Sequence, residues 1–168
     1  MYTGDPHPAM LGTLPDGEQG TRATLKVMVN LVRQYRKSIR IRDLALDLVR
    51  PLASRDWPGE VSAVFNWVRD NIRYTRDIRN VETVQTPEVT LEVEQGDCDD
   101  KSVLLASLLE SIGHPTRFIA VGFKQAGAYS HVLVQTRIGP RWIPLDPIMP
   151  FDAGWSPPGP RAVMIAHV

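Results

Sequence analysis

The strongest constraint on the fold is a segment of helical length that is apolar on most of its sides. Asp97 is a good N-cap residue, Asp100 follows three positions later, and Gly113 suits the C′ position that ends a helix. Between these ends the apolar residues are Val103, Leu104, Leu105, Ala106, Leu108, Leu109 and Ile112. Because this apolar stripe is so wide, the sequence predicts a helix after Asp97 that is largely buried.

Three further helices are predicted before this segment, because apolar residues recur there at intervals of three or four. They cover Thr21–Tyr35, Asp43–Val49 and Pro58–Arg73, and Pro51 ends the second. Residues 76–95 form a long connection with a turn signal at Thr86–Pro87. A connection of this length is a candidate wall for a cleft.

After the buried helix the pattern changes to short β-like runs separated by turns that contain Gly. The runs are Thr116–Phe123, Tyr129–Arg137 and Arg141–Asp146, and Val163–Ile165 is a candidate edge strand. The sequence therefore predicts an α+β protein with a helical N-terminal half, in which the buried helix packs on a small antiparallel sheet.

The length of 168 residues supports one domain. Residues 1–20 hold three Pro and four Gly, which favours an extended N-terminal arm. We assign residues 21–168 to the domain, with a Pro-rich C-terminal tail. The tail prolines are Pro147, Pro150, Pro157, Pro158 and Pro160.

Charge and hydropathy exclude several partners. The chain carries 19 basic and 19 acidic side chains, so we expect neither a nucleic acid nor a membrane as partner. The N-terminus does not read as a signal peptide, and no apolar stretch reaches 18 residues. We therefore expect a soluble cytoplasmic protein, and a virion-associated protein would have the same features.

Cys98 is the only cysteine, so it cannot form an internal disulfide. As the first residue of a helix capped by Asp97, it would lie where the helix dipole lowers a thiol pKa. Asp97, Asp99 and Asp100 oppose that effect by repulsion, so a thiolate would need His131 as a cationic partner. The alternative is a buried, inert thiol.

His131 and Asp146 fall on two neighbouring strands of the predicted hairpin. If its link pairs Arg137 with Trp142, Leu133 lies opposite Asp146, and His131 is the diagonal neighbour of Asp146 on the same face. That separation permits a hydrogen bond between the two side chains. A register shift of one residue would place them on opposite faces.

Three motifs in order resemble the transglutaminase-like superfamily of cysteine peptidases, amidases and amide-exchanging enzymes. They are "GDCDDKSVLLASLLESIGHPTRFIAVGF", "YSHVLVQTR" and "RWIPLDPI", with a weaker likeness in "FNWVRDNIRYTRD". The resemblance implies a papain-like fold in which Cys98 is the nucleophile, His131 the general base and acid, and Asp146 the residue that orients the imidazole. It implies no cofactor.

The acidic form "GDCDD" departs from the better-known enzymes and resembles bacterial and phage-encoded members. Family architecture implies an oxyanion site made by the Cys98 backbone N–H and an upstream donor. We select Gln85 for that donor. Trp57, Asn66 and Tyr74 are the alternatives.

The function expected from the resemblance is hydrolysis of an amide or peptide bond in a protein or peptide substrate, through a thioester on Cys98. One alternative is a transglutaminase that crosslinks proteins. Another is a structural protein, for example a phage-particle component, that docks to a larger assembly through residues 1–20. We expect no metal, although Asp97, Asp99 and Asp100 with His131 form an alternative cation site.

Overall fold

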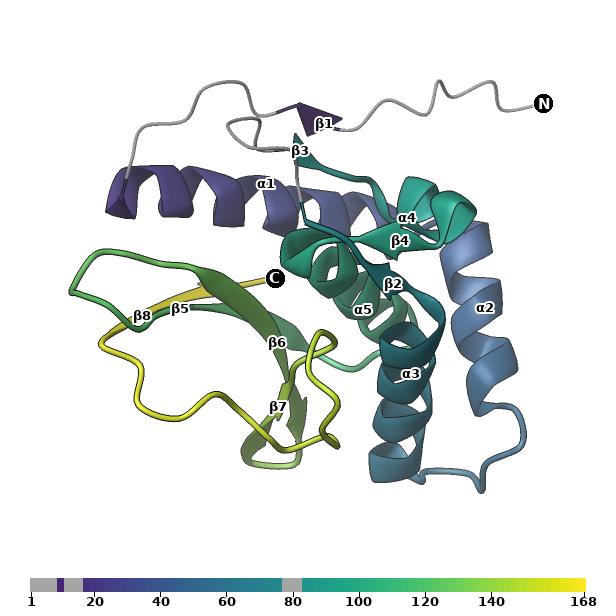
Figure 1. Cartoon of the computed structure of the whole chain (residues 1–168). Helices are drawn as coiled ribbons and strands as arrows, with labels where there is room; N and C mark the ends of the chain where they lie inside the picture. The colour runs from purple at the N-terminus through teal and green to yellow at the C-terminus, as the bar shows by residue number, and fades with distance from the viewer. Residues whose placement is uncertain (1–8, 11–16, 77–82) are drawn as a thin grey trace.

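A computed structural model of the chain describes residues 9–10, 17–76 and 83–168. It has a helical layer packed beside a curved antiparallel sheet (Figure 1). The helices are α1 (Glu18–Tyr35), α2 (Ile39–Val49), α3 (Trp57–Asn71), α4 (Pro87–Val93) and α5 (Cys98–Ser111). The α+β class and the helical N-terminal half predicted from the sequence are confirmed.

Helix α5 is the buried centre of the fold. Every residue from Asp100 to Leu109 is buried, and α5 packs against the other four helices and two strands of the sheet. The wide apolar stripe is the cause, because such a helix is stable in water only when neighbours cover it on all sides. The predicted buried helix after Asp97 is confirmed.

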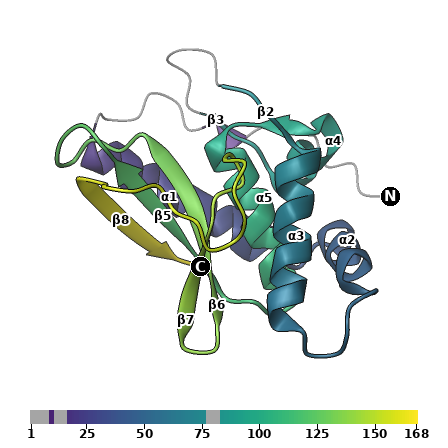
Figure 2. The same ribbon diagram turned by 60° about the horizontal axis from the view of Figure 1, so that its bottom comes forward.

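The main sheet contains β5 (Thr116–Gly122), β6 (His131–Ile138), β7 (Arg141–Leu145) and β8 (Ala162–His167). Its strand order is β7-β6-β5-β8, and all neighbours are antiparallel. Figure 2 shows the same sheet from below, with β8 at one edge. The predicted edge strand is therefore present, and it extends beyond Val163–Ile165 at both ends.

Two pairs of short strands link segments of the helical layer. Strand β1 (Ala9–Met10) runs antiparallel to β3 (Thr83–Val84), and β2 (Arg73–Tyr74) runs parallel to β4 (Gln95–Gly96). The second pairing matters for the candidate site, because β4 ends one residue before the N-cap of α5. It joins the end of α3 to the start of α5.

Four helix boundaries differ from the sequence prediction, including both ends of α3, which covers Trp57–Asn71 in place of Pro58–Arg73. Helix α1 begins at Glu18, three residues before Thr21, and α2 begins at Ile39, four residues before Asp43. The segment interpreted as a turn at Thr86–Pro87 instead starts α4. The Thr86 hydroxyl accepts a hydrogen bond from the Val89 N–H, and Pro87 occupies the first helical position, where its missing N–H costs nothing.

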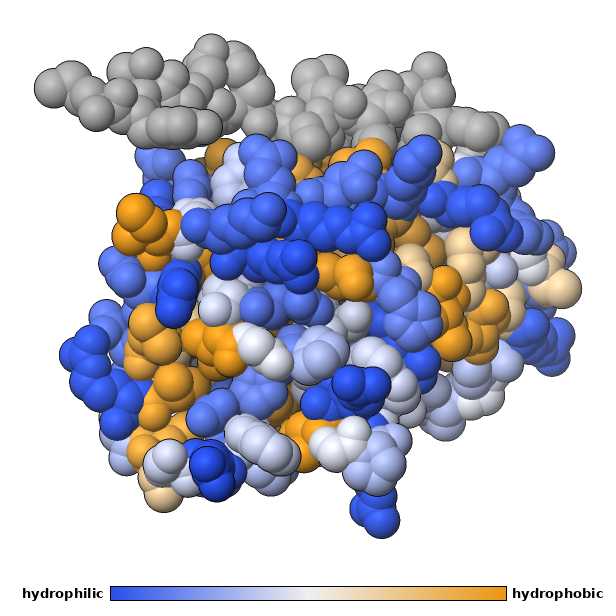
Figure 3. Space-filling model, turned by 180° about the vertical axis from the view of Figure 1, so that it is seen from behind, coloured by the Kyte–Doolittle hydropathy of each residue, from blue (hydrophilic) through white to orange (hydrophobic). Residues whose placement is uncertain are grey.

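The predicted extended arm lies largely outside the described residues, so it stays a prediction. No helix in the described ranges is long and apolar enough to cross a bilayer. Seen from behind, hydrophobic residues form separate patches among hydrophilic ones (Figure 3).

Candidate active site

The start of α5 is fixed by a capping box that positions Cys98 as the first helical residue. The Asp97 carboxylate accepts hydrogen bonds from the N–H groups of Asp99 and Asp100, at 2.9 and 3.0 Å. The Asp100 carboxylate in turn accepts from the Asp97 N–H at 3.1 Å. The two carboxylates satisfy backbone groups that a helix leaves unpaired, so the chain direction at Cys98 is well defined.

Gly96 is required by this arrangement. A Cβ atom at Gly96 would lie 2.5 Å from the Cβ of Asp100, which is too close for two carbon atoms. The Asp100 side chain is buried, and its second oxygen accepts from the Gln85 N–H at 2.7 Å. Glycine two residues before the cysteine therefore makes room for the carboxylate that closes the cap.

Lys101 anchors the same turn to α3. Its Nζ donates to the carbonyl oxygens of Arg69 and Ile72, at 3.2 and 2.5 Å, at the C-terminal end of α3. An ammonium group at a helix C-terminus is favourable, because it satisfies free carbonyls and the negative end of the dipole. Burial lowers the pKa of Lys101 to about 8, while the negative charges of Asp70 and Asp146 oppose that decrease. No pattern in the sequence indicates this role of Lys101.

His131 and Asp146 meet at one end of the sheet. The hairpin pairs Arg137 with Trp142, which is the register under which the sequence places the two side chains on one face. His131 Nε2 lies 2.7 Å from Asp146 Oδ2, and the other Asp146 oxygen accepts from the Ile148 N–H at 3.1 Å. The predicted proximity of these two side chains is confirmed. Asp146 is buried, and each of its carboxylate oxygens has one of these two hydrogen-bond partners.

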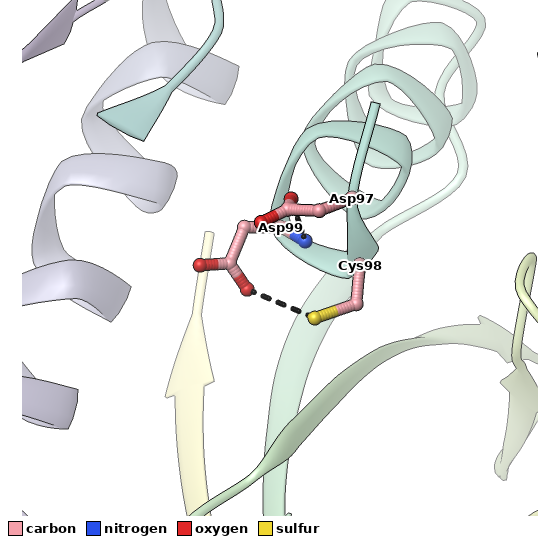
Figure 4. A group of neighbouring side chains, drawn as sticks. All are labelled: Asp97, Cys98 and Asp99. Carbon is pink, nitrogen blue, oxygen red and sulfur yellow. Dashed lines mark hydrogen bonds between the residues drawn. The ribbon is translucent and has the colours of Figure 1, made fainter. Parts of the chain in front are cut away.

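The Cys98 thiol faces a carboxylate. Figure 4 shows its hydrogen bond to Asp99 Oδ1, at 3.5 Å. Burial raises the pKa of Cys98 above its usual value, and the charges of Asp99 and Asp97 raise it further, whereas a backbone hydrogen bond from Val132 lowers it. The sequence expectation of a lowered pKa at the helix N-terminus is therefore wrong, because desolvation and two adjacent carboxylates outweigh the dipole.

The raised pKa gives a first prediction, for Asp99→Asn. A raised pKa keeps the thiol protonated at neutral pH, so removing the neighbouring charge should lower the pKa and increase the thiolate fraction. We expect alkylation of Cys98 by iodoacetamide at pH 8 to become about three- to tenfold faster. Asp43→Asn, a matched change on an exposed part of α2, should leave the rate unchanged. Equal rates in the two variants would show that Asp99 does not control the thiol.

In the described part of the chain, no hydrogen bond joins the side chains of Cys98 and His131; the thiol donates to Asp99 and His131 contacts Asp146. The backbone hydrogen bond to the thiol comes from Val132, the residue after His131. Because a carboxylate only accepts hydrogen bonds, the Asp146 contact assigns the proton to Nε2 and leaves Nδ1 as the basic nitrogen. Because the Val132 backbone contacts the thiol, Cys98 lies next to the start of β6.

The oxyanion candidates differ in position. Gln85 is tied to the first turn of α5 through Asp100, and its side-chain oxygen accepts from Thr90 at 3.4 Å. Tyr74 pairs with Gly96 across the β2–β4 ladder. Trp57 starts α3, at the end opposite to the one that Lys101 contacts. The fold thus leaves Gln85 and Tyr74 near the start of α5 and Trp57 far from it. Asn66 lies in the middle of α3.

Cation binding is an alternative chemistry for the acidic residues at the start of α5. Donor atoms of Asp97, Cys98 and Asp99 lie within 4.8 Å of one another. The alternative cation site expected from the sequence was instead Asp97, Asp99 and Asp100 with His131, without the cysteine. Both Asp100 oxygens already accept backbone hydrogen bonds, so their geometry serves the helix cap.

Comparisons with known proteins agree with this architecture. A family model described as the transglutaminase-like superfamily matches residues 42–147. No curated protein sequence matches the chain.

Two solved structures show a similar fold. A candidate cysteine protease from Cytophaga hutchinsonii has a TM-score of 0.55 and 18% identity, over 72% of this chain and 42% of that one. A candidate protease from Parabacteroides distasonis has a TM-score of 0.62 and 14% identity, over 79% of this chain and 30% of that one. The chain therefore spans less than half the length of either protein.

Proposed function

The chain belongs to the transglutaminase-like superfamily, and from this premise we propose that it hydrolyses an amide or peptide bond through a thioester on Cys98. The observation that carries the proposal is the 2.7 Å contact between His131 Nε2 and Asp146 Oδ2 at the start of β6. The residue after His131 makes a backbone hydrogen bond to the Cys98 thiol. We thus assign the roles of nucleophile, base and orienting acid to Cys98, His131 and Asp146.

In this proposal His131 Nδ1 is the general base. Asp146 accepts the hydrogen bond from Nε2, so it holds the imidazole in the tautomer that leaves Nδ1 unprotonated, and it stabilises the imidazolium that forms later. Because the Cys98 pKa is raised, the free protein holds a thiol and not a stored thiolate. Proton transfer to His131 must therefore accompany attack by sulfur.

The proposed reaction has two halves. Cys98 Sγ bonds to the carbonyl carbon of the substrate while its proton moves to Nδ1 of His131, and the leaving amine takes that proton as the C–N bond breaks. Water then attacks the thioester, gives a proton to Nδ1, and releases the carboxylic acid. The same proton returns to sulfur when the C–S bond breaks.

The start of α5 offers a place for the negative charge that develops on the substrate oxygen. The cap engages the N–H groups of Asp99 and Asp100. Within the described ranges, no hydrogen bond occupies the Cys98 N–H. This group at a helix N-terminus is a preorganised oxyanion donor, and the Gln85 side-chain amide is the proposed second donor.

A protein or peptide is the proposed substrate class, because both structural neighbours are described as candidate proteases. The test is to profile a library of peptides and simple amides with the wild-type chain and Cys98→Ala. The proposal expects cleavage products only with wild type. Products formed equally by both proteins would assign the activity elsewhere.

A further inference from the structure

Phe151 and Trp155 form an exposed aromatic pair on the loop that follows Asp146. Their ring centroids are 4.4 Å apart with a tilt of 32°, and Phe151 is 42% exposed. Trp155 is half-buried beside it, and contiguous exposed apolar surface of this kind marks interaction sites in many proteins. The pair thus needs an explanation that the proposed chemistry does not supply.

The loop is held firmly against the rest of the fold. Arg69 of α3 donates to the Phe151 carbonyl at 3.0 Å, and the Gly154 N–H donates to the Pro144 carbonyl of β7 at 2.8 Å. The Trp155 N–H donates a hydrogen bond to the Asp152 carbonyl at 3.2 Å, and this bond closes a turn. The aromatic pair is therefore preorganised, which lowers the entropic cost of binding a ligand.

The same contacts place the loop beside the candidate active site. The loop starts directly after Asp146, and the Arg69 carbonyl accepts from Lys101 in the first turn of α5. Figures 1 and 2 agree that the loop rises between β6 and α3 and reaches α5. A substrate bound at Cys98 would extend along elements that border this loop.

The charge around the pair selects a cationic ligand. The Asp152 side chain is fully exposed, and Asp70 is 58% exposed. The Arg69 guanidinium contacts both carboxylates: it binds Asp70 through two hydrogen bonds, lies 3.7 Å from Asp152 Oδ1, and is only 19% exposed. Because two carboxylates share this one guanidinium, negative charge is left over beside the rings. Aromatic faces attract cations, and a nearby carboxylate adds to that attraction.

We propose that Phe151, Trp155 and Asp152 form a substrate subsite for a Lys or Arg side chain of a peptide. This inference rests on the proposed function and names its substrate class. The aliphatic stem would lie on the rings, and the charged end would reach Asp152. Asp97 and Asp99 beside Cys98 favour the same sign of charge.

The test uses tripeptidyl acyloxymethyl ketones that carry Arg, Lys, Leu or Glu at one position in turn. The Cys98 sulfur forms a bond to the methylene carbon, the carboxylate leaves with the C–O bond electrons, and the thiol proton passes to solvent. Labelling is measured by intact mass. At the position that reaches the loop, we expect Arg and Lys probes to react about tenfold faster than Leu, with Glu slowest.

The double variant Phe151→Leu with Asp152→Asn should remove this advantage and leave the iodoacetamide rate unchanged. Trp57→Leu is the matched control and should retain it, because Trp57 is an exposed aromatic (51%) at the far end of α3. Equal rates for Arg and Leu in wild type, or an advantage that survives the double variant, would overturn the subsite alone. Failure of every peptidyl probe to label Cys98, while iodoacetamide does, would overturn the proposed function and the subsite with it.

Discussion

Replacing His131 by alanine should lower the rate of acyl transfer to Cys98 by about 10³-fold, within the range expected for loss of a general base. The reason is the raised pKa of the thiol. Burial and the charges of Asp99 and Asp97 keep sulfur protonated, so attack depends on a base that takes the proton at that moment. Release of p-nitrophenol from p-nitrophenyl acetate measures the rate without knowledge of the natural substrate.

The control for this prediction is His167→Ala, which removes an exposed histidine from edge strand β8. Asp146→Asn should retain part of the activity, because an amide oxygen still accepts from Nε2 and orients the ring. Thermal unfolding separates a loss of chemistry from a loss of fold. A folded His131→Ala protein with undiminished turnover would remove His131 from the mechanism.

Gly122→Ala should be among the most destabilising single substitutions in the chain. A Cβ at Gly122 would lie 1.6 Å from the backbone oxygen of Ala128, and a backbone atom cannot rotate away. Gly122 also pairs with Ala162 in β8, and its carbonyl accepts from the Arg161 N–H at 2.7 Å. Displacing the strand breaks these contacts, so we expect the free energy of unfolding to fall by about 3 kcal/mol or more.

Gly127→Ala in the same hairpin is the matched control. Gly127 has a φ of 76° with open space around its Cβ position, so only backbone strain opposes alanine, at about 1 kcal/mol. Urea unfolding of both variants compares the two costs. If Gly122→Ala is as stable as Gly127→Ala, the close approach of β5 to the hairpin is not as described. Activity should fall with stability in Gly122→Ala, because this hairpin leads into His131.

The sequence predicted the parts of the fold that depend on periodicity and local turn chemistry. The buried helix α5 follows from the spacing of its apolar stripe. The sequence left the register of the β6–β7 hairpin open, and the structure selects the one that pairs Arg137 with Trp142. Helix α4 was missed because Thr86–Pro87 serves equally as a turn or as an N-cap with its first helical residue. The choice between them depends on packing against the rest of the helical layer. A short stretch of sequence carries no information about that packing.

The candidate site was predictable in its members but not in its electrostatics. Cys98, His131 and Asp146 stand in recognisable motifs, and their roles here stay proposals. The direction of the Cys98 pKa shift was wrong, since the largest cause is burial of the thiol, and burial depends on how the folded chain covers the start of α5. Lys101 was missed for a similar reason, because only the fold brings its ammonium group to the end of α3.

The most direct measurement is to trap the acyl group during turnover. The wild-type chain is mixed with p-nitrophenyl acetate, quenched in acid, and examined by intact mass and peptide mapping. Because Cys98 is the only cysteine, a thioester has one position in the sequence. The account predicts one acetyl group on Cys98 in wild type, and neither adduct nor turnover in Cys98→Ala. Turnover by Cys98→Ala at the wild-type rate, with no acetyl group on Cys98 of the wild type, would contradict it.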